Sequence, residues 1–308
     1  MTPLVSVILP NYNHSKFLID RINSILNQSY SNIEVIILDD KSTDDSLNTI
    51  NLFSNNPKVK GIITNDINSG STFKQWLKGI DKCSGDFIWI AESDDAAEED
   101  FLQTMIQKML NHENVVLGYC GSKIIDENGK RTNYLNYTSL PNIAQDQRFS
   151  SEFVLKGGEF IQELLLAENN IPNASAVLFR KSALRNNYIN SILDFKLYGD
   201  WYFWILLAQK GDVYFTPALM NNFRIHENTV RKQKSKQLAT FFENINLYIY
   251  LINFYPDKKR ILSDRLIFKY CNYFRKEVSL NEAIRIHLKL WKIDRHYAYK
   301  FIKSIILK

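Results

Sequence analysis

The chain has 308 residues, of which 45% are hydrophobic and 13% aromatic, so it can build one large domain or two smaller ones, and long disorder is excluded. The net charge of +5 is unevenly distributed: residues 228–308 have a net charge of +12, and the rest of the chain has a net charge of −7. An acidic body with a basic C-terminal region indicates two regions with different tasks.

The first 120 residues alternate between strand and helix patterns. The predicted strands are 5–9, 34–38, 59–64, 87–91 and 115–119, and the predicted helices are 16–26, 44–53 and 71–81. Thr43 is the expected N-cap of the second helix. Because the strands are almost continuously apolar and alternate with helices, we expect an α/β protein with a mostly parallel sheet covered on both faces.

The rest of the chain has shorter patterns. Residues 126–130 (DENGK) predict a hairpin turn. The further predicted strands are 176–179, 213–216 and 222–226, and the further predicted helices are 158–167, a short one from Lys181, and 200–209. Beyond residue 228 we expect helices, broken at Pro256 and near Ser279.

Polar residues follow each of the first four strands. They are residues 10–14 (PNYNH), 39–44 (DDKSTD), 65–71 (NDINSGS) and 94–95 (DD). The carboxyl ends of parallel strands meet at one edge of a sheet, where ligands bind. An aromatic ring at Tyr12, a carboxylate at Asp40, a basic residue at Lys74 and an acidic pair together suit a nucleotide diphosphate.

The acidic pair Asp94 and Asp95 comes directly after a buried strand. Two adjacent carboxylates there are costly unless something neutralises them, and hard divalent cations prefer carboxylate oxygens. The alternative is that one of them caps a helix beginning near Ala97.

Five segments appear in an order that resembles a known family. They are 5–13 (VSVILPNYN), 24–30 (SILNQSY), 34–44 (EVIILDDKSTD), 68–70 (NSG) and 85–95 (GDFIWIAESDD). The set is similar to family-2 inverting glycosyltransferases with the Rossmann-like GT-A fold, of the type that builds bacterial surface polysaccharides. The resemblance covers roughly residues 4–227.

The resemblance implies a nucleotide site and a metal. The implied nucleotide-binding residues are Pro10, Tyr12, Asp39, Asp40, Lys74 and Asp94. Asp40 would bind a uracil-type base edge and Lys74 would face the phosphates, while Asp94 would reach the ribose or the metal. Asp95 would ligate Mg²⁺ or Mn²⁺, which stabilises the charge of a departing diphosphate.

The resemblance also implies a general base. Asp200 matches the second position of the family's Glu-Asp motif, and Gly199 departs from it at the first. Alternatively, Asp200 caps the helix from Trp201. Trp201 itself would either stack on a sugar face or belong to the core.

Three further residues have two interpretations each. His226 matches a family histidine near the metal or the diphosphate, and could equally be structural. Asn173 and Ser175 lie where the family shapes its acceptor site, and could equally start a strand. The other histidines receive no chemical role: His14, His112, His287 and His296.

The basic region 228–308 is rich in aromatic residues. Basic helices with aromatic side chains suit an anionic membrane surface. Alternatively, the region packs on the catalytic domain with solvated lysines. Nucleic acid is not an expected partner, because no binding motif is present and the body is acidic.

We therefore expect a metal-dependent inverting glycosyltransferase that transfers a sugar from a nucleotide-diphosphate donor, UDP-linked by resemblance, to a glycan or lipid-linked acceptor. The catalytic domain would span 1–227, with a nucleotide-sugar half at about 1–120 and an acceptor half at about 121–227. The alternatives are a non-catalytic nucleotide-binding subunit of a glycan-assembly complex and a sugar nucleotidyltransferase. The latter would need a Gly-rich basic loop after the first strand, and 10–14 has neither glycine nor a Lys or Arg.

The expected location is cytoplasmic, peripheral on the inner face of the membrane. Met1 leads directly into a strand without a signal peptide, and no apolar run reaches the roughly 20 residues of a membrane span. Cys83, Cys120 and Cys271 are far apart, which indicates a reducing compartment without a disulfide framework.

Overall fold

The structure, a computed structural model, describes residues 2–132, 146–166, 168–184, 187–226, 237–269 and 279–293, with 295, 296, 298, 299 and 303. The chain divides into two compact units. The first comprises Met1–Leu165, Asn169–Asp194 and Gly199–His226, and the second comprises Leu166–Glu168, Phe195–Tyr198 and Glu227–Lys308.

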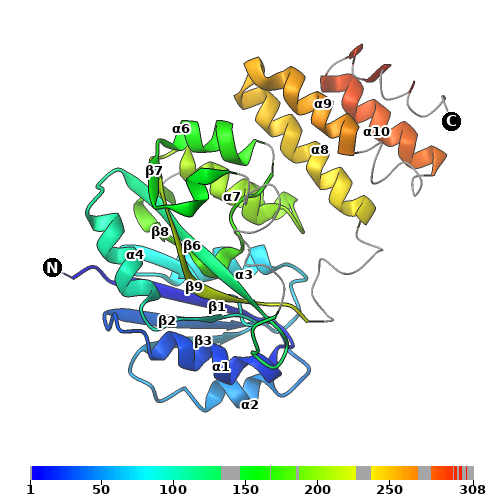
Figure 1. Cartoon of the computed structure of the whole chain (residues 1–308). Coiled ribbons are helices and arrows are strands. Elements are labelled where there is room, and N and C mark those ends of the chain that lie inside the picture. The colour runs from blue at the N-terminus through cyan, green and yellow to red at the C-terminus, as the bar shows by residue number, and fades with distance from the viewer. Residues whose placement is uncertain are drawn as a thin grey trace. The chain divides into compact units, whose positions relative to one another are not determined.

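The first unit is built on one sheet (Figure 1). Its strands are β1 Val5–Asn11, β2 Ile33–Asp39, β3 Val59–Thr64, β4 Phe87–Ile90, β5 Ala96–Ala97, β6 Val115–Ile125, β7 Phe153–Leu155, β8 Val177–Arg180 and β9 Asp212–Arg224. Among the described residues the sheet has nine strands in the order β3-β2-β1-β4-β8-β6-β9-β5, with β7 paired to β9. Strands β1 to β4 are parallel, β8 runs antiparallel between β4 and β6, and β6 pairs with β9 in parallel.

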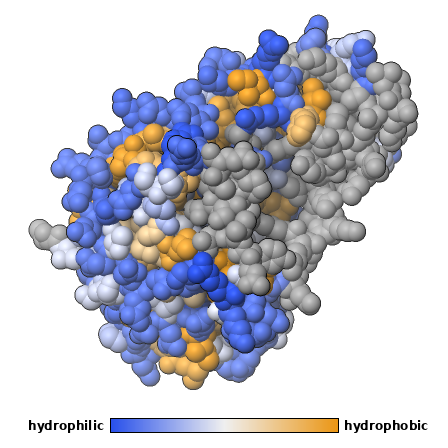
Figure 2. Space-filling model, viewed as in Figure 1, coloured by the Kyte–Doolittle hydropathy of each residue, from blue (hydrophilic) through white to orange (hydrophobic). Residues whose placement is uncertain are grey.

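Helices cover both faces of this sheet. They are α1 Ser15–Leu26, α2 Ser46–Asn51, α3 Thr72–Lys82, α4 Phe101–Leu110, α6 Gly157–Phe160 and α7 Gly199–Ala208. Side chains alternate along a strand, so Val7 of β1 packs in one core with Ile22 of α1 and Met105 of α4. On the opposite face Gly79 of α3 lies against Ile8, so closely that a Cβ there would be 2.5 Å from Ile8 Cγ2. The predicted α/β fold with a mostly parallel sheet is confirmed. Where Figure 2 colours the surface by hydropathy, hydrophilic residues predominate on the face shown.

Strands β6 and β9 differ from their sequence patterns. The predicted strand at 115–119 continues to Ile125, and the two strands predicted at 213–216 and 222–226 are one strand. The long parallel pairing of β6 with β9 continues through register shifts near Gly121, so the polar residues inside β9 do not end it. The predicted turn at 126–130 is confirmed, since Asp126 N–H donates to Lys130 O at 2.9 Å.

The predicted cap at Thr43 is wrong. Helix α2 begins at Ser46 and is preceded by Asp45. Thr43 instead donates its backbone N–H to Asn13 Oδ1 at 2.7 Å, which ties its loop to the end of β1.

The second unit contains three helices among its described residues: α8 Gln237–Phe254, α9 Lys259–Lys269 and α10 Leu280–Ile293. Both predicted breaks are confirmed. Pro256 begins a 3-10 turn after α8. Ser279 and Glu282 form a capping box, in which Ser279 N–H donates to Glu282 Oε2 at 2.8 Å and Glu282 N–H donates back to Ser279 Oγ at 3.4 Å. The part of the chain that the structure describes has no helix long and apolar enough to cross a membrane.

Candidate active site

Asp39 joins the ends of β1 and β2. Asn11 and Asp39 are register partners, and Asn11 Nδ2 donates to Asp39 Oδ2 at 2.8 Å. The backbone N–H of Ser42 donates to Asp39 Oδ1 at 2.9 Å and its hydroxyl to Oδ2 at 2.6 Å. The fully buried carboxylate of Asp39 therefore fixes the loop after β2.

The loops after β1 and β2 both contain a residue in the left-handed region. Asn13 has a φ of 56° and Lys41 a φ of 63°, values that side-chain-bearing residues adopt at a cost. Between the buried Pro10 and Asn13, the ring of Tyr12 is 45% exposed. Strained loops thus present an aromatic ring to solvent at the carboxyl edge of the sheet.

Asp40 is the anchor of the loop after β3. Its Oδ1 accepts hydrogen bonds from Asn65 Nδ2 at 2.6 Å, from Ser69 N–H at 2.8 Å and from Gln75 Nε2 at 2.9 Å. Its Oδ2 accepts from Ser69 Oγ at 2.8 Å and retains a second lone pair. Lys74 is exposed beside this loop and donates to Ser69 O at 3.2 Å.

The helix-cap interpretation of Asp94 and Asp95 is wrong. Residues Ala96–Ala97 form strand β5, and α4 does not begin until Phe101, preceded by Asp100. The two carboxylates therefore do not cap a helix.

Asp95 is buried and its carboxylate binds other parts of the chain. Oδ2 accepts from Asn173 Nδ2 at 2.7 Å, and Oδ1 accepts from the backbone N–H of Arg224 at 2.9 Å. Burial and the neighbouring charge of Asp94 raise the pKa of Asp95 to about 7. Glu92 is similar, because burial and Asp94 raise its pKa to about 8 although Trp76 Nε1 donates to it at 2.8 Å.

Asp94 faces two histidines. Its Oδ2 lies 3.1 Å from Nε2 of His226, and burial, which opposes ionisation, is outweighed by His226 and His14, so the pKa of Asp94 is lowered. Among the described residues, His14, Asp94 and His226 form a metal-capable group whose ligand atoms all lie within 4.8 Å of one another. Burial lowers the pKa of His14, which favours the neutral imidazole that binds metals. The sequence analysis gave His14 no role, since only the folded chain brings it to Asp94.

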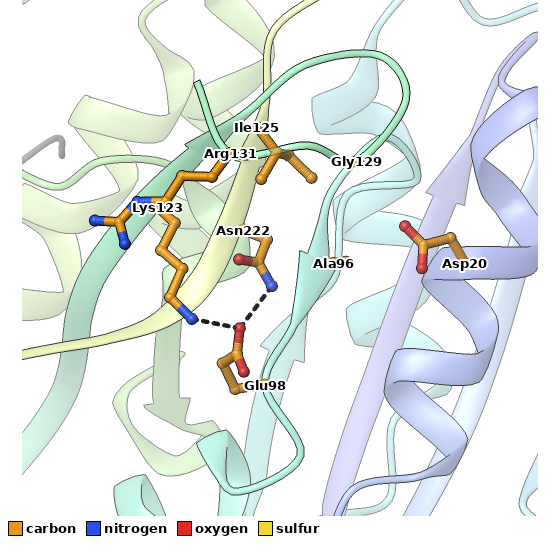
Figure 3. Close-up of a pocket in the computed structure, with 8 residues that line it drawn as sticks. All are labelled: Asp20, Ala96, Glu98, Lys123, Ile125, Gly129, Arg131 and Asn222. Carbon is orange, nitrogen blue, oxygen red and sulfur yellow. Dashed lines mark hydrogen bonds and ion pairs between the residues drawn. The ribbon is translucent and has the colours of Figure 1, made fainter. Parts of the chain in front are cut away.

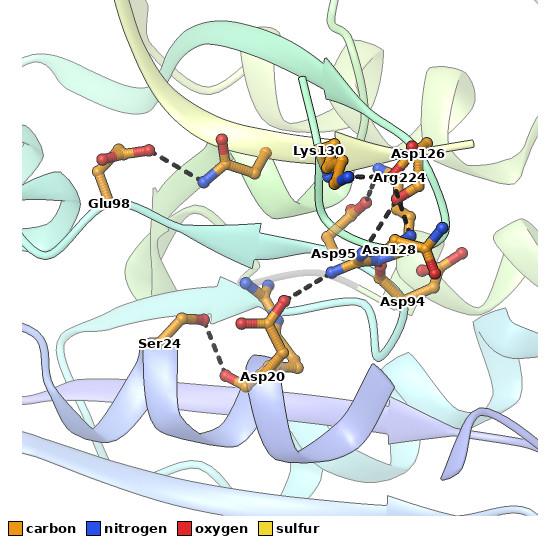
Figure 4. A network of polar contacts seen from close by, with 11 residues as sticks. Asp20, Ser24, Asp94, Asp95, Glu98, Asp126, Asn128, Lys130 and Arg224 are labelled. Atoms are coloured by element: carbon orange, nitrogen blue, oxygen red, sulfur yellow. Dashed lines mark hydrogen bonds and ion pairs between the residues drawn. The ribbon is translucent and has the colours of Figure 1, made fainter. Parts of the chain in front are cut away.

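Residues 92–95, between β4 and β5, form an acidic loop. Arg224 links this acidic loop to α1 and to the turn after β6 (Figure 4). The buried guanidinium donates from Nε to Asp94 O at 2.7 Å, from Nη1 to Asp126 O at 3.1 Å, and from Nη2 to Asp20 Oδ2 at 2.6 Å. It also lies 4.9 Å from the ring centroid of Phe17. Arg224 thus fixes the end of β9 two residues before His226, a role that the sequence analysis missed.

Arg21 is a second buried arginine beside the acidic loop. It lies 4.8 Å from the Trp89 ring, and its guanidinium nitrogens have no hydrogen-bond acceptor among the described residues. Burial lowers its pKa to about 10, against the opposing charges of Asp95 and Asp94. The guanidinium therefore offsets negative charge in this loop without fixing its geometry.

Asp200 lies in the first turn of α7, which begins one residue earlier. Its Oδ1 accepts the backbone N–H of Trp201 at 2.7 Å, and its Oδ2 accepts from Asn169 Nδ2 at 3.1 Å. Trp201 is buried and donates from Nε1 to Leu165 O at 2.9 Å. Trp201 therefore belongs to the core, and the alternative that it stacks on a sugar is wrong.

Gly199, the departure from the family's motif, packs against Phe73. A Cβ at Gly199 would lie 2.5 Å from Phe73 Cε2, so a larger residue does not fit there. Phe73 in turn packs on Trp76, with ring centroids 5.1 Å apart, and Trp76 binds Glu92. These contacts connect the start of α7 to the acidic loop.

Asn173 and Ser175 hold the acidic loop in place. Besides its bond to Asp95, Asn173 accepts through Oδ1 from Asn221 Nδ2 at 3.1 Å. Ser175 is fully buried, and its Oγ accepts from the backbone N–H of Glu92 at 3.1 Å. Their polar atoms are therefore engaged inside the protein, which favours a structural role over sugar binding.

A pocket of about 400 Å³ lies beside this acidic loop, since its lining residue Ala96 directly follows Asp95 and its lining residue Asp20 pairs with Arg224 (Figure 3). Glu98 binds both Lys123 and Asn222 there, at 2.8 and 3.0 Å. The pocket contains none of the predicted site residues. Its lining residues are Asp20, Ala96, Glu98, Lys123, Ile125, Gly129, Arg131 and Asn222.

The mostly parallel sheet with polar loops at its carboxyl edge defines an α/β protein, and comparison with known proteins gives the family. Residues 6–186 match the family described as Glycosyl transferase family 2. The chain belongs to this family and is a glycosyltransferase, as the sequence motifs predicted.

Relatives cover nearly the whole chain. An uncharacterized glycosyltransferase of Haemophilus influenzae is 25% identical over 99% of this chain and 97% of its own length. A Campylobacter jejuni protein named GalNAc(5)-diNAcBac-PP-undecaprenol beta-1,3-glucosyltransferase is 24% identical over 94% of this chain and 86% of its own. The crystal structure of S. aureus TarS 1-349 in complex with UDP-GlcNAc has a TM-score of 0.73 at 18% identity, covering 98% of this chain and 89% of TarS, and it confirms the GT-A fold.

Proposed function

We propose that this glycosyltransferase transfers a sugar from a UDP-linked donor to a hydroxyl of a glycan or lipid-linked acceptor, with inversion and with the help of Mg²⁺ or Mn²⁺. The observation that carries the proposal is the pairing of Asp94 with His226 at the edge of the sheet where Tyr12 and Asp40 are presented. The UDP-GlcNAc complex of TarS supports the donor class, and the name of the Campylobacter relative supports a lipid-linked acceptor.

The donor nucleotide binds in the loops after β1, β2 and β3. Tyr12 stacks on the base, and Asp40 accepts a base N–H through Oδ2, its oxygen with the fewer internal bonds. Pro10 and Asp39 fix the shape of these loops. Lys74 is exposed beside them and is long enough to reach the diphosphate.

Asp94 and His226 hold the divalent cation. Their ligand atoms are 3.1 Å apart, close to the spacing of adjacent ligands around an ion with bonds of about 2.1 Å. The bound ion supplies charge stabilisation for the departing diphosphate. Asp95 was the expected ligand, but both its oxygens bind Asn173 and Arg224, so we assign it to supporting the loop.

Asp200 acts as the general base. It accepts the proton of the acceptor hydroxyl while the hydroxyl oxygen forms a bond to the anomeric carbon and the bond to the diphosphate breaks, leaving UDP. Asn169 orients the carboxylate through its 3.1 Å bond to Oδ2. Because attack and departure occur on opposite sides of the carbon in one step, the configuration inverts.

The catalytic domain spans residues 1–227, with a nucleotide-sugar half at about 1–120 and an acceptor half at about 121–227.

Residues 228–308 contact an anionic membrane surface. Helix α10 supports this contact. Its exposed side chains at Ile284, Leu288 and Trp291 share one side, and the guanidinium of Arg295 lies 5.7 Å from the Trp291 ring. An apolar stripe with flanking cations is the pattern of a helix that lies on a lipid surface.

Vesicle flotation of the full chain tests the membrane contact. We expect binding to vesicles with anionic lipid but not to zwitterionic ones, and loss of binding in the double variant Leu288→Ser with Trp291→Ser. The control is Ile67→Ser, an 81% exposed residue of the first unit. Equal binding by the double variant and the control would contradict the assignment.

A UDP-release assay with a panel of UDP-sugars, with and without Mn²⁺, tests the activity. We expect metal-dependent release with one donor, lost in Asp94→Asn and retained in Asp81→Asn, a control at an exposed residue of α3 outside the donor loops. Calorimetry with UDP follows if no sugar is turned over. UDP binding without turnover on any donor and acceptor would favour a non-catalytic subunit, and no binding with or without metal would overturn the nucleotide site.

A further inference from the structure

We infer that His14 is a third protein ligand of the divalent cation, so that the site has two imidazoles and one carboxylate and prefers Mn²⁺ to Mg²⁺. The inference rests on the metal-dependent function proposed above and deepens it by assigning a residue and a metal preference. It starts from the group formed by His14, Asp94 and His226, whose ligand atoms lie within 4.8 Å of one another.

The geometry fits one ion after a small movement. Two atoms bound to one ion at about 2.1 Å are at most about 4.2 Å apart, so the widest pair must approach by a fraction of an ångström. Asp94 and His226 are already at 3.1 Å, and the rings of His14 and His226 meet edge to face with centroids 5.5 Å apart. His14 is therefore the residue that a bound ion would draw in.

A partner beside His14 orients its ring. Nδ1 lies 2.8 Å from Ser93 Oγ, and a ring nitrogen that donates to such a partner leaves the lone pair of Nε2 for a metal. Phe17 packs against both histidine rings, with centroids 5.9 Å from His14 and 5.1 Å from His226. The side chains around the site thus restrict both imidazoles before any nucleotide arrives.

The donor set determines the metal preference. Mg²⁺ prefers oxygen ligands and keeps several waters, whereas imidazole nitrogens suit the transition metals. Two histidines and one carboxylate therefore favour Mn²⁺, and three protein ligands allow the ion to bind before the UDP-sugar. A site that relied on the diphosphate for most of its ligands would bind no metal alone.

Calorimetric titration of the nucleotide-free protein with MnCl₂ and with MgCl₂ tests this. We expect Mn²⁺ to bind more tightly than Mg²⁺, and His14→Asn to weaken Mn²⁺ binding by more than the roughly 10–100-fold that loss of an outer-shell partner costs. Electron spin-echo spectra of bound Mn²⁺ should show two nitrogen ligands in the wild type and one in His14→Asn. The matched control is His112→Asn at an exposed histidine, and circular dichroism checks the fold of each variant.

Three results would overturn the inference, and they differ in what they mean for the proposed function. Unchanged Mn²⁺ affinity in His14→Asn with weakened UDP binding would make His14 a diphosphate contact. Mn²⁺-dependent UDP release without Mn²⁺ binding to the nucleotide-free protein would leave the function standing and remove His14 as a ligand. Sugar transfer in the presence of EDTA would show that neither this inference nor the metal dependence in the proposed function is correct.

Discussion

Nε2 of His226 lies 3.1 Å from Oδ2 of Asp94, although 132 positions separate the two residues in the chain. The contact depends on β9, which runs beside β6 and ends at Arg224, two residues before His226.

Replacing His226 with Ala should abolish Mn²⁺ binding and metal-dependent UDP release while leaving the fold intact. The reason is that the imidazole is one of the proposed ligands, and it lies buried beyond the end of β9 against the rings of His14 and Phe17. Calorimetry measures the metal affinity, and thermal unfolding checks stability. Mn²⁺ binding by His226→Ala equal to that of the control His112→Ala would contradict the assignment.

Replacing Arg224 with Lys should destabilise the protein and weaken metal binding together. Lysine keeps the charge but cannot bind Asp94 O, Asp126 O and Asp20 at once, so buried acceptors are left unpaired at a cost of about 1–3 kcal/mol. Urea unfolding with and without Mn²⁺ measures both effects.

Asp20→Asn is the matched control for that experiment. The side chain of Asp20 is 59% exposed, so its ion pair with Arg224 contributes about 1 kcal/mol or less. If Asp20→Asn lost as much stability and Mn²⁺ binding as Arg224→Lys, the ion pair, and not the two carbonyl contacts, would hold the loop.

Replacing Asp200 with Asn should lower kcat by about 10²–10⁴-fold, because the amide cannot accept the proton of the acceptor hydroxyl. The binding of UDP and Mn²⁺ should be unchanged, since the hydrogen bonds of the Asp200 carboxylate to Asn169 and to Trp201 join it to residues that are not among the proposed donor and metal ligands. Steady-state kinetics and calorimetry separate the two. Retained kcat would remove Asp200 as the base.

The metal-free protein should become less stable as pH rises from about 4 to about 8. Burial raises the folded-state pKa of Asp95 to about 7 and of Glu92 to about 8, above unfolded values near 4. Over this range the unfolded chain releases protons that the folded chain keeps, so the free energy of unfolding falls.

Urea unfolding midpoints at pH 5, 6.5 and 8 in EDTA measure the slope, which is how steeply the free energy of unfolding falls with pH. Glu92→Gln should flatten it, because the amide oxygen still accepts from Trp76 Nε1 but carries no charge at high pH. Glu159→Gln, at an exposed position, should leave the slope unchanged. If Glu92→Gln and the wild type had the same slope, the raised pKa would belong to a group other than Glu92.

Replacing Gly199 with Ala should destabilise the first unit by about 1–3 kcal/mol, because the added Cβ meets the ring of Phe73. The cost should shrink in a Phe73→Leu background, and a double-mutant cycle measures this interaction. Gly158→Ala is the control, since a Cβ at Gly158 meets nothing within 4 Å. Equal costs in both backgrounds would show that Phe73 does not exclude larger residues at position 199.

The sequence by itself determined the fold class, the family and the edge of the sheet at which the polar loops gather. Apolar runs and helical spacing are local properties, so β3 was predicted at its observed bounds and the breaks at Pro256 and Ser279 were found. Asp39 and Asp40 were singled out because they follow the predicted strand 34–38, and in the structure Asp39 ends β2 and Asp40 comes directly after it.

Only the tertiary structure decided which side chains meet at that edge. His14 and Arg224 have no local pattern that marks them, and their partners Asp94 and Asp20 come from distant segments. Asp95, expected to face a metal, has both oxygens bound by Asn173 and Arg224. Hydrogen-bond partners and burial depend on which strands become neighbours, and the order in space of β8, β6 and β9 is not written in any single stretch of chain.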